Sequence, residues 1–458
     1  MPAAIAIQLP NTPRTSCPSR CKPPPVRLGT RTASYSGVAQ YLTAHTCGYN
    51  LRVPFSRLTF SPECDAEFFA GLPATPAVFV LRGEDPNGEP YVSKTSNLRR
   101  RLTRLLGPAE DRSRRLNLRD RVHEIEFAFT GSDFESGLVL YHTLRREFPK
   151  SYAKRLKLRP APLVRLMLEN QYPRVTVTTR IATLRGRSLY YGPFQSRVAA
   201  EKFANDVLDF FKIRRCTDEL NPDPSFPGCV YSEMKMCLAP CFRGCSDSEY
   251  NAEVARVQAF FDTRGLWLEH ELARQRDEAS MNLEFEAAAA LHTRIEKLAP
   301  VRQQCGEAVQ RLDTMRALIV QRSAEAESVA LFRVECGLIG DPIPFSLQLK
   351  SAEHTQKPQS MESRVQQALA AAPPLESASV AETVEQLAYL KRWVYRTNKT
   401  GEIFFADGKG ELPWRRVVRG ISRVYRGEKP GGELNETARD YWINRGRAAE
   451  INPEDYNV

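Results

Sequence analysis

Five of the eleven cysteines fall between Cys216 and Cys245, and four of them are spaced closely enough to form one metal site. These four are Cys216, Cys229, Cys237 and Cys241, with 12, 7 and 3 residues between them. Thiolates at such spacing bind zinc or an iron–sulfur cluster, because both accept four soft sulfur ligands. In a chain of 458 residues, one dense group of cysteines more often binds metal than forms a disulfide framework.

The second set of side chains that could do chemistry is a tyrosine, Tyr91, followed by a strongly basic segment. Tyr91 precedes a segment, Lys94 to Arg121, that holds ten basic residues against three acidic ones. Such a strip can neutralise several phosphates, in binding that depends on salt and not on base sequence. A charge run without other signals is more often a solvated helix face. The arginines expected to contact DNA are Arg99, Arg100, Arg101, Arg104, Arg114 and Arg115.

The third pattern is an apolar stripe with helical spacing. Its members are Ala288, Leu291, Ile295 and Leu298, and Phe285 lies at the edge of the same face. Such a stripe usually packs in the chain's own core or closes a helical hairpin. Two short helices bury little surface by themselves, so a partner protein that covers the stripe is the competing interpretation.

The composition is that of a folded, basic protein. The length of 458 residues is typical of about three domains, and a hydrophobic share of 42% is enough for real cores. The net charge of +11 favours a polyanionic partner such as nucleic acid, although solubility alone would also account for it. No apolar run approaches the roughly 20 residues that span a bilayer, and no secretory signal opens the chain. We therefore expect a cytoplasmic protein without membrane contact.

Hydrophobic periodicity and turn residues predict an α+β chain. The expected strands are 77–81 and 91–92, joined as a hairpin by a turn at 85–88, then 122–129, a strand-like section at 172–191, and 329–334 and 403–405. The expected helices begin at residue 98, capped by Ser96 or Asn97, and cover 134–148, 199–211, a segment opened by the capping box at Ser246 and Glu249, 266–280, 283–298 and 381–395. Residues 350–378 and 426–458 are polar and are expected to be loose.

The hairpin and the basic helix together resemble the GIY-YIG nuclease domain of the UvrC family of excinucleases. In that domain two short strands carry tyrosines and the next helix carries an arginine. Tyr91 matches the tyrosine of base chemistry, Lys94 the lysine beside it, and Arg101 the phosphate-facing arginine. The resemblance implies cleavage of DNA, which needs a base, a cation, and a carboxylate that holds a divalent metal.

Five positions depart from that pattern, because Ala77 and Ser93 also stand in place of its two glycines. Phe79 replaces the other motif tyrosine. Placing Glu135 and Pro149 on the family's metal-binding helix puts Leu140 at the metal carboxylate and Tyr152 at an active-site asparagine. Leucine cannot ligate a divalent cation, and Glu135 points to a different face of the helix. We therefore expect an inactive centre without a divalent metal. The alternative is an active endonuclease whose metal carboxylate is displaced.

The cysteines and the apolar stripe resemble the same family. Its four-cysteine cluster matches Cys216, Cys229, Cys237 and Cys241, and implies a four-iron four-sulfur cluster, with zinc as the alternative. Cys245 lies outside that set. The stripe and the helix before it resemble the UVR motif, which implies docking on the same hairpin of a UvrB-type protein. Nothing after residue 306 resembles the family's second nuclease domain, which is similar to ribonuclease H.

These features predict a UvrC-like nucleotide excision repair protein that binds DNA and a UvrB-type partner without cutting. The rivals are the active endonuclease and a DNA-independent scaffold, which would leave the basic strip without a partner. The expected divisions are a disordered leader at 1–54, favoured over an organelle transit peptide, a GIY-YIG-like domain at 55–158, a linker and cysteine module at 159–245, a helical region at 246–301 with the hairpin from about 265, an unassigned α/β region at 302–425 and a loose tail at 426–458.

Overall fold

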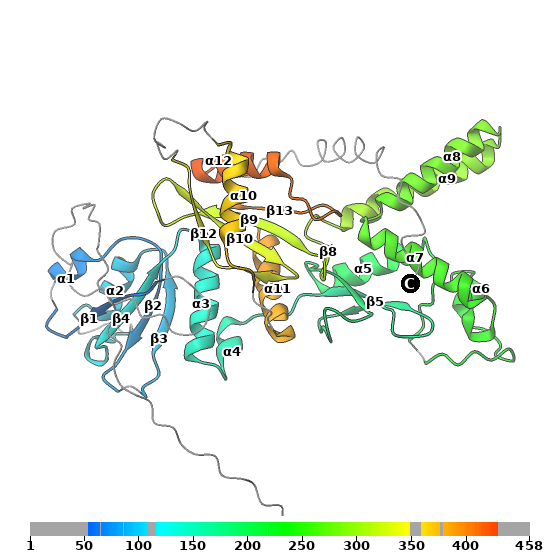
Figure 1. Cartoon of the computed structure of the whole chain (residues 1–458). Coiled ribbons are helices and arrows are strands. Elements are labelled where there is room, and N and C mark those ends of the chain that lie inside the picture. The colour runs from blue at the N-terminus through cyan, green and yellow to red at the C-terminus, as the bar shows by residue number, and fades with distance from the viewer. Residues whose placement is uncertain are drawn as a thin grey trace, which may run out of the picture. The chain divides into compact units, whose positions relative to one another are not determined.

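The computed structural model describes residues 54–428, apart from 65, 86, 109–115, 218, 349–358 and 376–378 (Figure 1). The predicted leader at 1–54, except for its last residue, and the predicted tail from residue 429 lie outside the described residues. Three antiparallel sheets with helices around them confirm the α+β class. None of the helices described is long and apolar enough to cross a membrane.

The first sheet holds the predicted hairpin. Its strands are β1 (Ser56–Thr59), β2 (Ala77–Arg82), β3 (Tyr91–Thr95) and β4 (Glu124–Phe129), in the order β1-β4-β2-β3. Its helices are α1 (Ala66–Gly71), α2 (Leu98–Leu106), α3 (Asp133–Glu147) and α4 (Tyr152–Leu156), with the short 3-10 helix η1 (Arg119–Arg121). β2 pairs with β3 so that Leu81 lies opposite Tyr91, which confirms the hairpin.

Helix α2 begins where the sequence predicts. The side chain of Asn97 accepts a hydrogen bond from the backbone N–H of Arg100 at 2.9 Å, which caps the helix. Leu98, Leu102 and Leu105 are buried in the core that α2 shares with the first sheet. The apolar side of α2 is thereby fixed, and its arginines are left on the other side.

The second sheet contains strands that are far apart in sequence. Its strands are β5 (Leu163–Met167), β6 (Arg174–Thr178), β7 (Leu189–Gly192) and β8 (Gln310–Arg311), in the order β6-β5-β7-β8. Around it lie α5 (Arg197–Leu208), α6 (Val230–Glu233), η2 (Pro240–Phe242) and α7 (Asp247–Asp262). The strand-like section at 172–191 is thus two strands, β6 and β7, with a loop between them.

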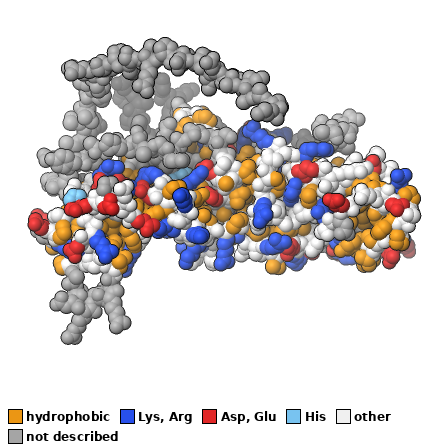
Figure 2. All heavy atoms as spheres, turned by 90° about the horizontal axis from the view of Figure 1, so that it is seen from below, with side chains coloured by type: hydrophobic (Ala, Val, Ile, Leu, Met, Phe, Trp, Pro, Cys, Tyr) orange, Lys and Arg blue, Asp and Glu red, His pale blue; other side chains and the backbone are white. Residues whose placement is uncertain are grey.

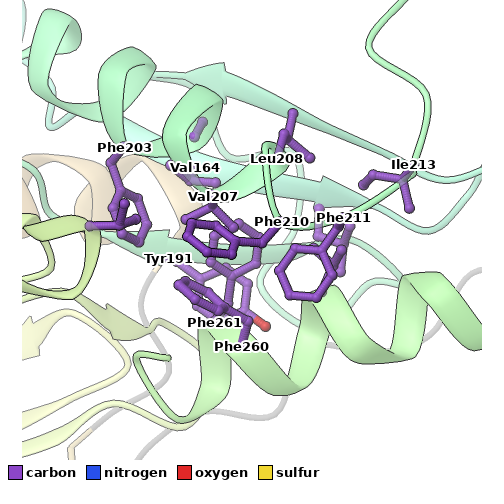
Figure 3. Close-up of a cluster of buried hydrophobic side chains, with 14 of the residues drawn as sticks. Val164, Tyr191, Phe203, Val207, Leu208, Phe210, Phe211, Ile213, Phe260 and Phe261 are labelled. Carbon is purple, nitrogen blue, oxygen red and sulfur yellow. The ribbon is translucent and has the colours of Figure 1, made fainter. Parts of the chain in front are cut away.

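An aromatic core joins this sheet to α5 and α7. Figure 3 shows Phe203 of α5 and Phe260 and Phe261 of α7 gathered with Tyr191 of β7. The rings of Tyr191 and Phe261 lie 5.0 Å apart, and the Tyr191 hydroxyl donates to Asp262 at 2.8 Å. Helix α7 opens with the predicted capping box, in which Ser246 and Glu249 each accept the other's backbone N–H.

Two long helices, α8 (Leu266–Met281) and α9 (Phe285–Gln304), form the predicted hairpin. Leu268, Leu272 and Leu298 are buried and join the core of the second sheet. At the turn, Met281, Leu283 and Phe285 are 77%, 73% and 65% exposed. One end of the hairpin is therefore part of the core, and the other end carries apolar side chains in solvent.

The third sheet accounts for the region that the sequence leaves unassigned. Its strands are β9 (Arg316–Arg322), β10 (Ser328–Glu335), β11 (Leu338–Ile339), β12 (Ile343–Ser346) and β13 (Glu402–Phe405), in the order β11-β10-β9-β13 with β12 also paired to β10. Its helices are α10 (Met361–Ala371), α11 (Val380–Val394) and α12 (Trp414–Arg426). The strands expected at 329–334 and 403–405 and the helix at 381–395 are confirmed.

Both faces of the third sheet are covered. Along β9, Leu318 and Val320 enter a core with α10 and α12, whereas Ala317 and Ile319 enter another with α11. This second core also contains Phe134 of α3, whose ring lies 5.1 Å from that of Phe332. Helix α3 therefore packs against the third sheet as well as the first.

Two helices correct the sequence analysis. The predicted loose section at 350–378 contains α10, which is capped by Ser360 but buries only Val365 fully. A helix with so narrow an apolar side gives a weak periodic signal. The other helix, α12, is not predicted because its β-branched residues and Gly420 lower its intrinsic helix propensity.

Gly420 is required by the close packing of α12 on β13. A Cβ atom at this position would lie 2.2 Å from the ring of Phe404, which is buried. We expect Gly420→Ala to lower the free energy of unfolding by about 1–3 kcal/mol through overpacking. Gly408 has no heavy atom within 4 Å of its Cβ position, so Gly408→Ala is the matched control. Denaturant unfolding of both variants measures the effect, and equal stability would contradict this packing.

Candidate nucleic-acid interface and cysteine cluster

The structure brings Tyr91 and Arg101 together. Arg101 on α2 donates from its guanidinium to the Tyr91 hydroxyl on β3 at 2.8 Å. The Arg101 Nε is buried and has no hydrogen-bond partner among the described residues. Phe79 on β2 is fully buried, with its ring 6.1 Å from that of Tyr91. The missing tyrosine is thus replaced by a core residue, and one phenol remains beside one guanidinium.

Lys94 faces a carboxylate that the sequence analysis did not single out. Its ammonium lies 2.6 Å from Asp133, the first residue of α3, and Arg396 donates to the other Asp133 oxygen at 2.5 Å. Burial alone would raise the pKa of Asp133, but Lys94 and then Arg396 hold it below its ordinary value. An acidic residue after the N-cap Ser132 is common in a helix, so its position alone did not mark Asp133 as functional.

Leu140 and Tyr152, the two residues expected to depart from the family's site, both contact other parts of the fold. Leu140 on α3 is half-buried against Val78, Ala128 and Val139. Tyr152 donates its hydroxyl to Glu385 of α11 at 2.6 Å, so this hydroxyl is engaged by the third sheet's helix. Leu140 thus packs toward the first sheet, whereas Tyr152 packs toward the third.

The other carboxylates of α3 have partners of their own. Glu147 accepts two hydrogen bonds from Arg82, at 2.8 and 3.0 Å. Burial raises the pKa of Glu147, but Arg82 outweighs it and lowers the pKa overall. Glu135 accepts from the backbone N–H of Gly131 at 2.7 Å, and it is buried. These contacts hold both groups in structural roles.

The basic strip is only partly available for DNA. Arg100 and Arg104 on α2 are exposed, and within the described residues neither has an ion-pair partner. Arg99 is exposed too, but its Nε donates to the carbonyl of Leu72 at 2.6 Å. Arg114 and Arg115 lie outside the described residues. On the face of the molecule that it presents, Figure 2 shows basic side chains dispersed among acidic and apolar ones.

The four predicted cysteine ligands lie in one neighbourhood. Cys216, Cys229, Cys237 and Cys241 are free and partly exposed. Burial raises the pKa of Cys237 to about 11, the N–H of Ala239 lowers it, and the other three thiols raise it further. That N–H donates to the Cys237 sulfur at 3.3 Å. Lys235, Ala239 and Arg243 have left-handed backbones, which turn the chain sharply around these thiols.

Four soft thiols within reach of each other's charge suit zinc or an iron–sulfur cluster by donor type. They do not form a closed set, because no three Cys, His, Asp or Glu side chains of the described chain converge closely enough to hold a metal ion. Cys245 lies nearby, and burial followed by Glu249 and Asp247 raises its pKa. The residue types therefore fit a metal centre, while the sulfur positions are more open than a bound metal requires.

The predicted partner stripe divides into two parts. Leu298 is 1% exposed and lies within the chain's own core, so it is not part of an open face. Leu291 and Ile295 are half-buried against the same core, and Ala288 is half-buried higher up the hairpin. Phe285 is the member of the set that is open to solvent.

Comparison with known proteins gives one family and many relatives. The family model of the UvrC/Cho excinuclease middle domain matches residues 162–260, which hold β5 to β7, α5, the four cysteines and most of α7. UvrABC system protein C of Rickettsia rickettsii (strain Sheila Smith) is 29% identical over 220 residues, 47% of this chain and 33% of the relative. The protein of the same name from Rickettsia bellii (strain RML369-C) is 27% identical over 257 residues, 54% of this chain and 39% of the relative.

The match spans only about a third of the length of these relatives. No solved structure matches the chain. The matched middle domain holds three of the four strands of the second sheet, most of its aromatic core and the cysteine segment. On these grounds the chain is similar to the UvrC family, and its residues 162–260 match that family's middle domain.

Proposed function

We propose that this protein acts in nucleotide excision repair, where it binds DNA and a UvrB-type partner without cutting the DNA. The observation that carries the proposal is which side chains α3 presents and how its carboxylates are bonded. By the resemblance, Leu140 takes the place of the family's metal carboxylate, and the structure shows that Glu135 and Glu147 accept hydrogen bonds from Gly131 and Arg82. Cleavage needs a carboxylate that is free to hold a divalent cation.

Binding would use the charges that remain. Arg100 and Arg104 are exposed on α2, beside the Tyr91–Arg101 pair. Guanidinium groups contact phosphates without a metal, so DNA affinity does not require an intact nuclease centre. Cytoplasmic localisation belongs to the same proposal.

The active endonuclease is the second candidate, and Asp133 is the observation that favours it. This carboxylate lies 2.6 Å from Lys94, at the start of the same helix. It is bound to two cations, Lys94 and Arg396, and would have to leave both to ligate a metal. If Asp133 left both cations, it would lose the interactions that keep its pKa low.

The first prediction for the proposed function concerns cutting. On damaged duplex with a UvrB-type partner and magnesium or manganese, we expect binding by fluorescence anisotropy but no incision above background. Two variants separate the candidates. Metal-dependent nicking that is lost in both Tyr91→Phe and Asp133→Asn would establish the active endonuclease with Asp133 as a ligand. Absence of DNA binding would instead favour the DNA-independent scaffold.

The second prediction concerns the cysteines, for which we propose a four-iron four-sulfur cluster held by Cys216, Cys229, Cys237 and Cys241. Protein isolated without oxygen should be brown and contain four irons per chain by metal analysis. Cys237→Ser should remove most of the iron, because one of four ligands is lost, while the control Cys245→Ser should keep it. One zinc per chain without iron would establish the zinc alternative, and no bound metal would refute both.

The third prediction concerns the hairpin, for which we propose docking of a UvrB-type hairpin on its open end. Phe285→Ala in the full chain should weaken binding to that hairpin by about 2 kcal/mol or more, since buried aromatic anchors dominate small interfaces. Its unfolding free energy should stay unchanged, because Phe285 is 65% exposed. Titration calorimetry and denaturant unfolding measure the two effects.

Leu298 provides the contrast in the same helix. Leu298→Ala should lower the free energy of unfolding by about 2–5 kcal/mol, because Leu298 is 1% exposed in the core. A Phe285→Ala variant that loses stability in the same way would make Phe285 a core residue. No binding of the unmutated chain at high micromolar concentration would refute the partner site.

A further inference from the structure

Helix α12 is unusually basic for a helix that packs on a sheet. Over Trp414–Arg426 it carries five arginines and no acidic residue. At 3.6 residues per turn, Arg415, Arg419 and Arg426 fall on one side of the helix, within a sector of about 40°. Val417, Ile421 and Val424 fall on the opposite side. The helix is therefore divided into a cationic face and an apolar face.

The apolar face of α12 is fully used by the third sheet. Val417 and Ile421 are 0% exposed and Val424 is 4% exposed, in the core with Leu318 and Val320 of β9. A basic amphipathic helix binds a membrane surface by inserting its apolar face into the lipid. In α12 that face is not available, so the cationic face is what the helix offers to a partner.

Two of the five arginines are consumed by ion pairs with acids of the fold. Arg423 makes a bidentate pair with the buried Glu402, at 2.7 and 2.6 Å, and Arg416 lies 3.3 Å from Glu307. These pairs lie on the sides of the helix that turn toward the protein. They account for Arg416 and Arg423 without any partner outside the chain.

On the cationic face, Arg415 and Arg419 are not paired with acidic residues of the described chain. Arg415 and Arg419 are exposed, and neither has an ion-pair or hydrogen-bond partner in the described part of the chain. Arg426 lies 3.2 Å from Glu428, but both side chains are about half exposed or more, where an ion pair contributes little. The face from Arg415 to Arg426 is about 16 Å long at 1.5 Å per residue.

The basic surface continues beyond the first turn of α12. A shallow groove beside it is lined by Arg316, Arg333 and Trp414, with Glu335 as its acidic residue. Arg316 is exposed, and its guanidinium lies within 3.4 Å of the Cβ position of Gly410. Two guanidinium groups and an indole in one groove favour an anionic, partly aromatic ligand, which is the chemistry of nucleotides.

We propose that the face formed by Arg415, Arg419 and Arg426 is a second nucleic-acid surface, which binds the phosphate backbone of duplex DNA. It lies on the third sheet and is separate from the arginines of α2. Arginine suits this role because its planar guanidinium can donate two hydrogen bonds to one phosphate. Contacts to the phosphate backbone carry no sequence information, so binding through this face is independent of sequence.

The test compares salt dependence in the full chain. Each phosphate contact contributes about 0.9 to the slope of log affinity against log salt, so Arg415→Gln with Arg419→Gln should lower that slope by about 1.8. Over a fourfold rise in salt, the variant then loses roughly twelvefold less affinity than the unmutated chain. The control is Arg197→Gln with Lys202→Gln on α5, which removes the same charge from residues already paired with Glu201 and Asp206.

A second pair of variants separates this surface from α2. Arg100→Gln with Arg104→Gln should lower the slope independently, and combining both pairs should add their effects. If the control lowers the slope as much as the α12 variant, the effect is net charge alone and the α12 surface is refuted. The α12 surface is also refuted, while the α2 surface stands, if only the α2 variant lowers the salt slope of DNA binding. The same holds if the α12 variant changes binding to anionic lipid vesicles but not to DNA. If the unmutated chain does not bind DNA, both surfaces fail.

Discussion

The burial of α3 between two sheets is the constraint on which the rest of the structure depends. Val139 packs toward the first sheet, while Phe134 and Leu138 enter the core of the third. Gly137 lies so close to Tyr389 of α11 that a Cβ atom would meet its hydroxyl at 2.4 Å. A helix packed on two sides has little surface left for a solvent-accessible metal, and its polar residues must find partners within the protein.

The polar residues of α3 follow this constraint. Tyr141 donates to Glu385 at 2.8 Å, and so does Tyr152 of α4, so one carboxylate of α11 accepts from two phenols. Burial and then Glu385 raise the pKa of Tyr152 to about 12, which keeps its hydroxyl a donor. Arg145 pairs with Glu382 at 2.8 Å in the same interface. These contacts hold α3 and α4 against α11.

The sequence predicted what local rules determine. The β2–β3 hairpin, the Asn97 cap and the capping box at Ser246 depend on neighbouring residues, and each is confirmed. The contacts of Asp133 with Arg396 join residues 263 apart, which no local pattern encodes. Likewise, the stripe at Ala288 to Leu298 has one period along its whole length, and only packing decides that Leu298 is core while Phe285 is open. Periodicity identifies an apolar face, but it does not say what covers that face.

Packing also decides which of the protein's arginines are paired within the fold and which are open to a partner. A net charge of +11 is compatible with solubility alone, but the structure divides the arginines by what they touch. Arg82 and Arg423 are paired with the buried carboxylates of Glu126 and Glu402, and removing either arginine would weaken the compensation of a buried charge. Arg100 and Arg415, in contrast, stabilise no acid of the fold within the described residues, and nothing in the packing requires a cation there. Cations that the fold does not need are those to examine for a polyanionic partner.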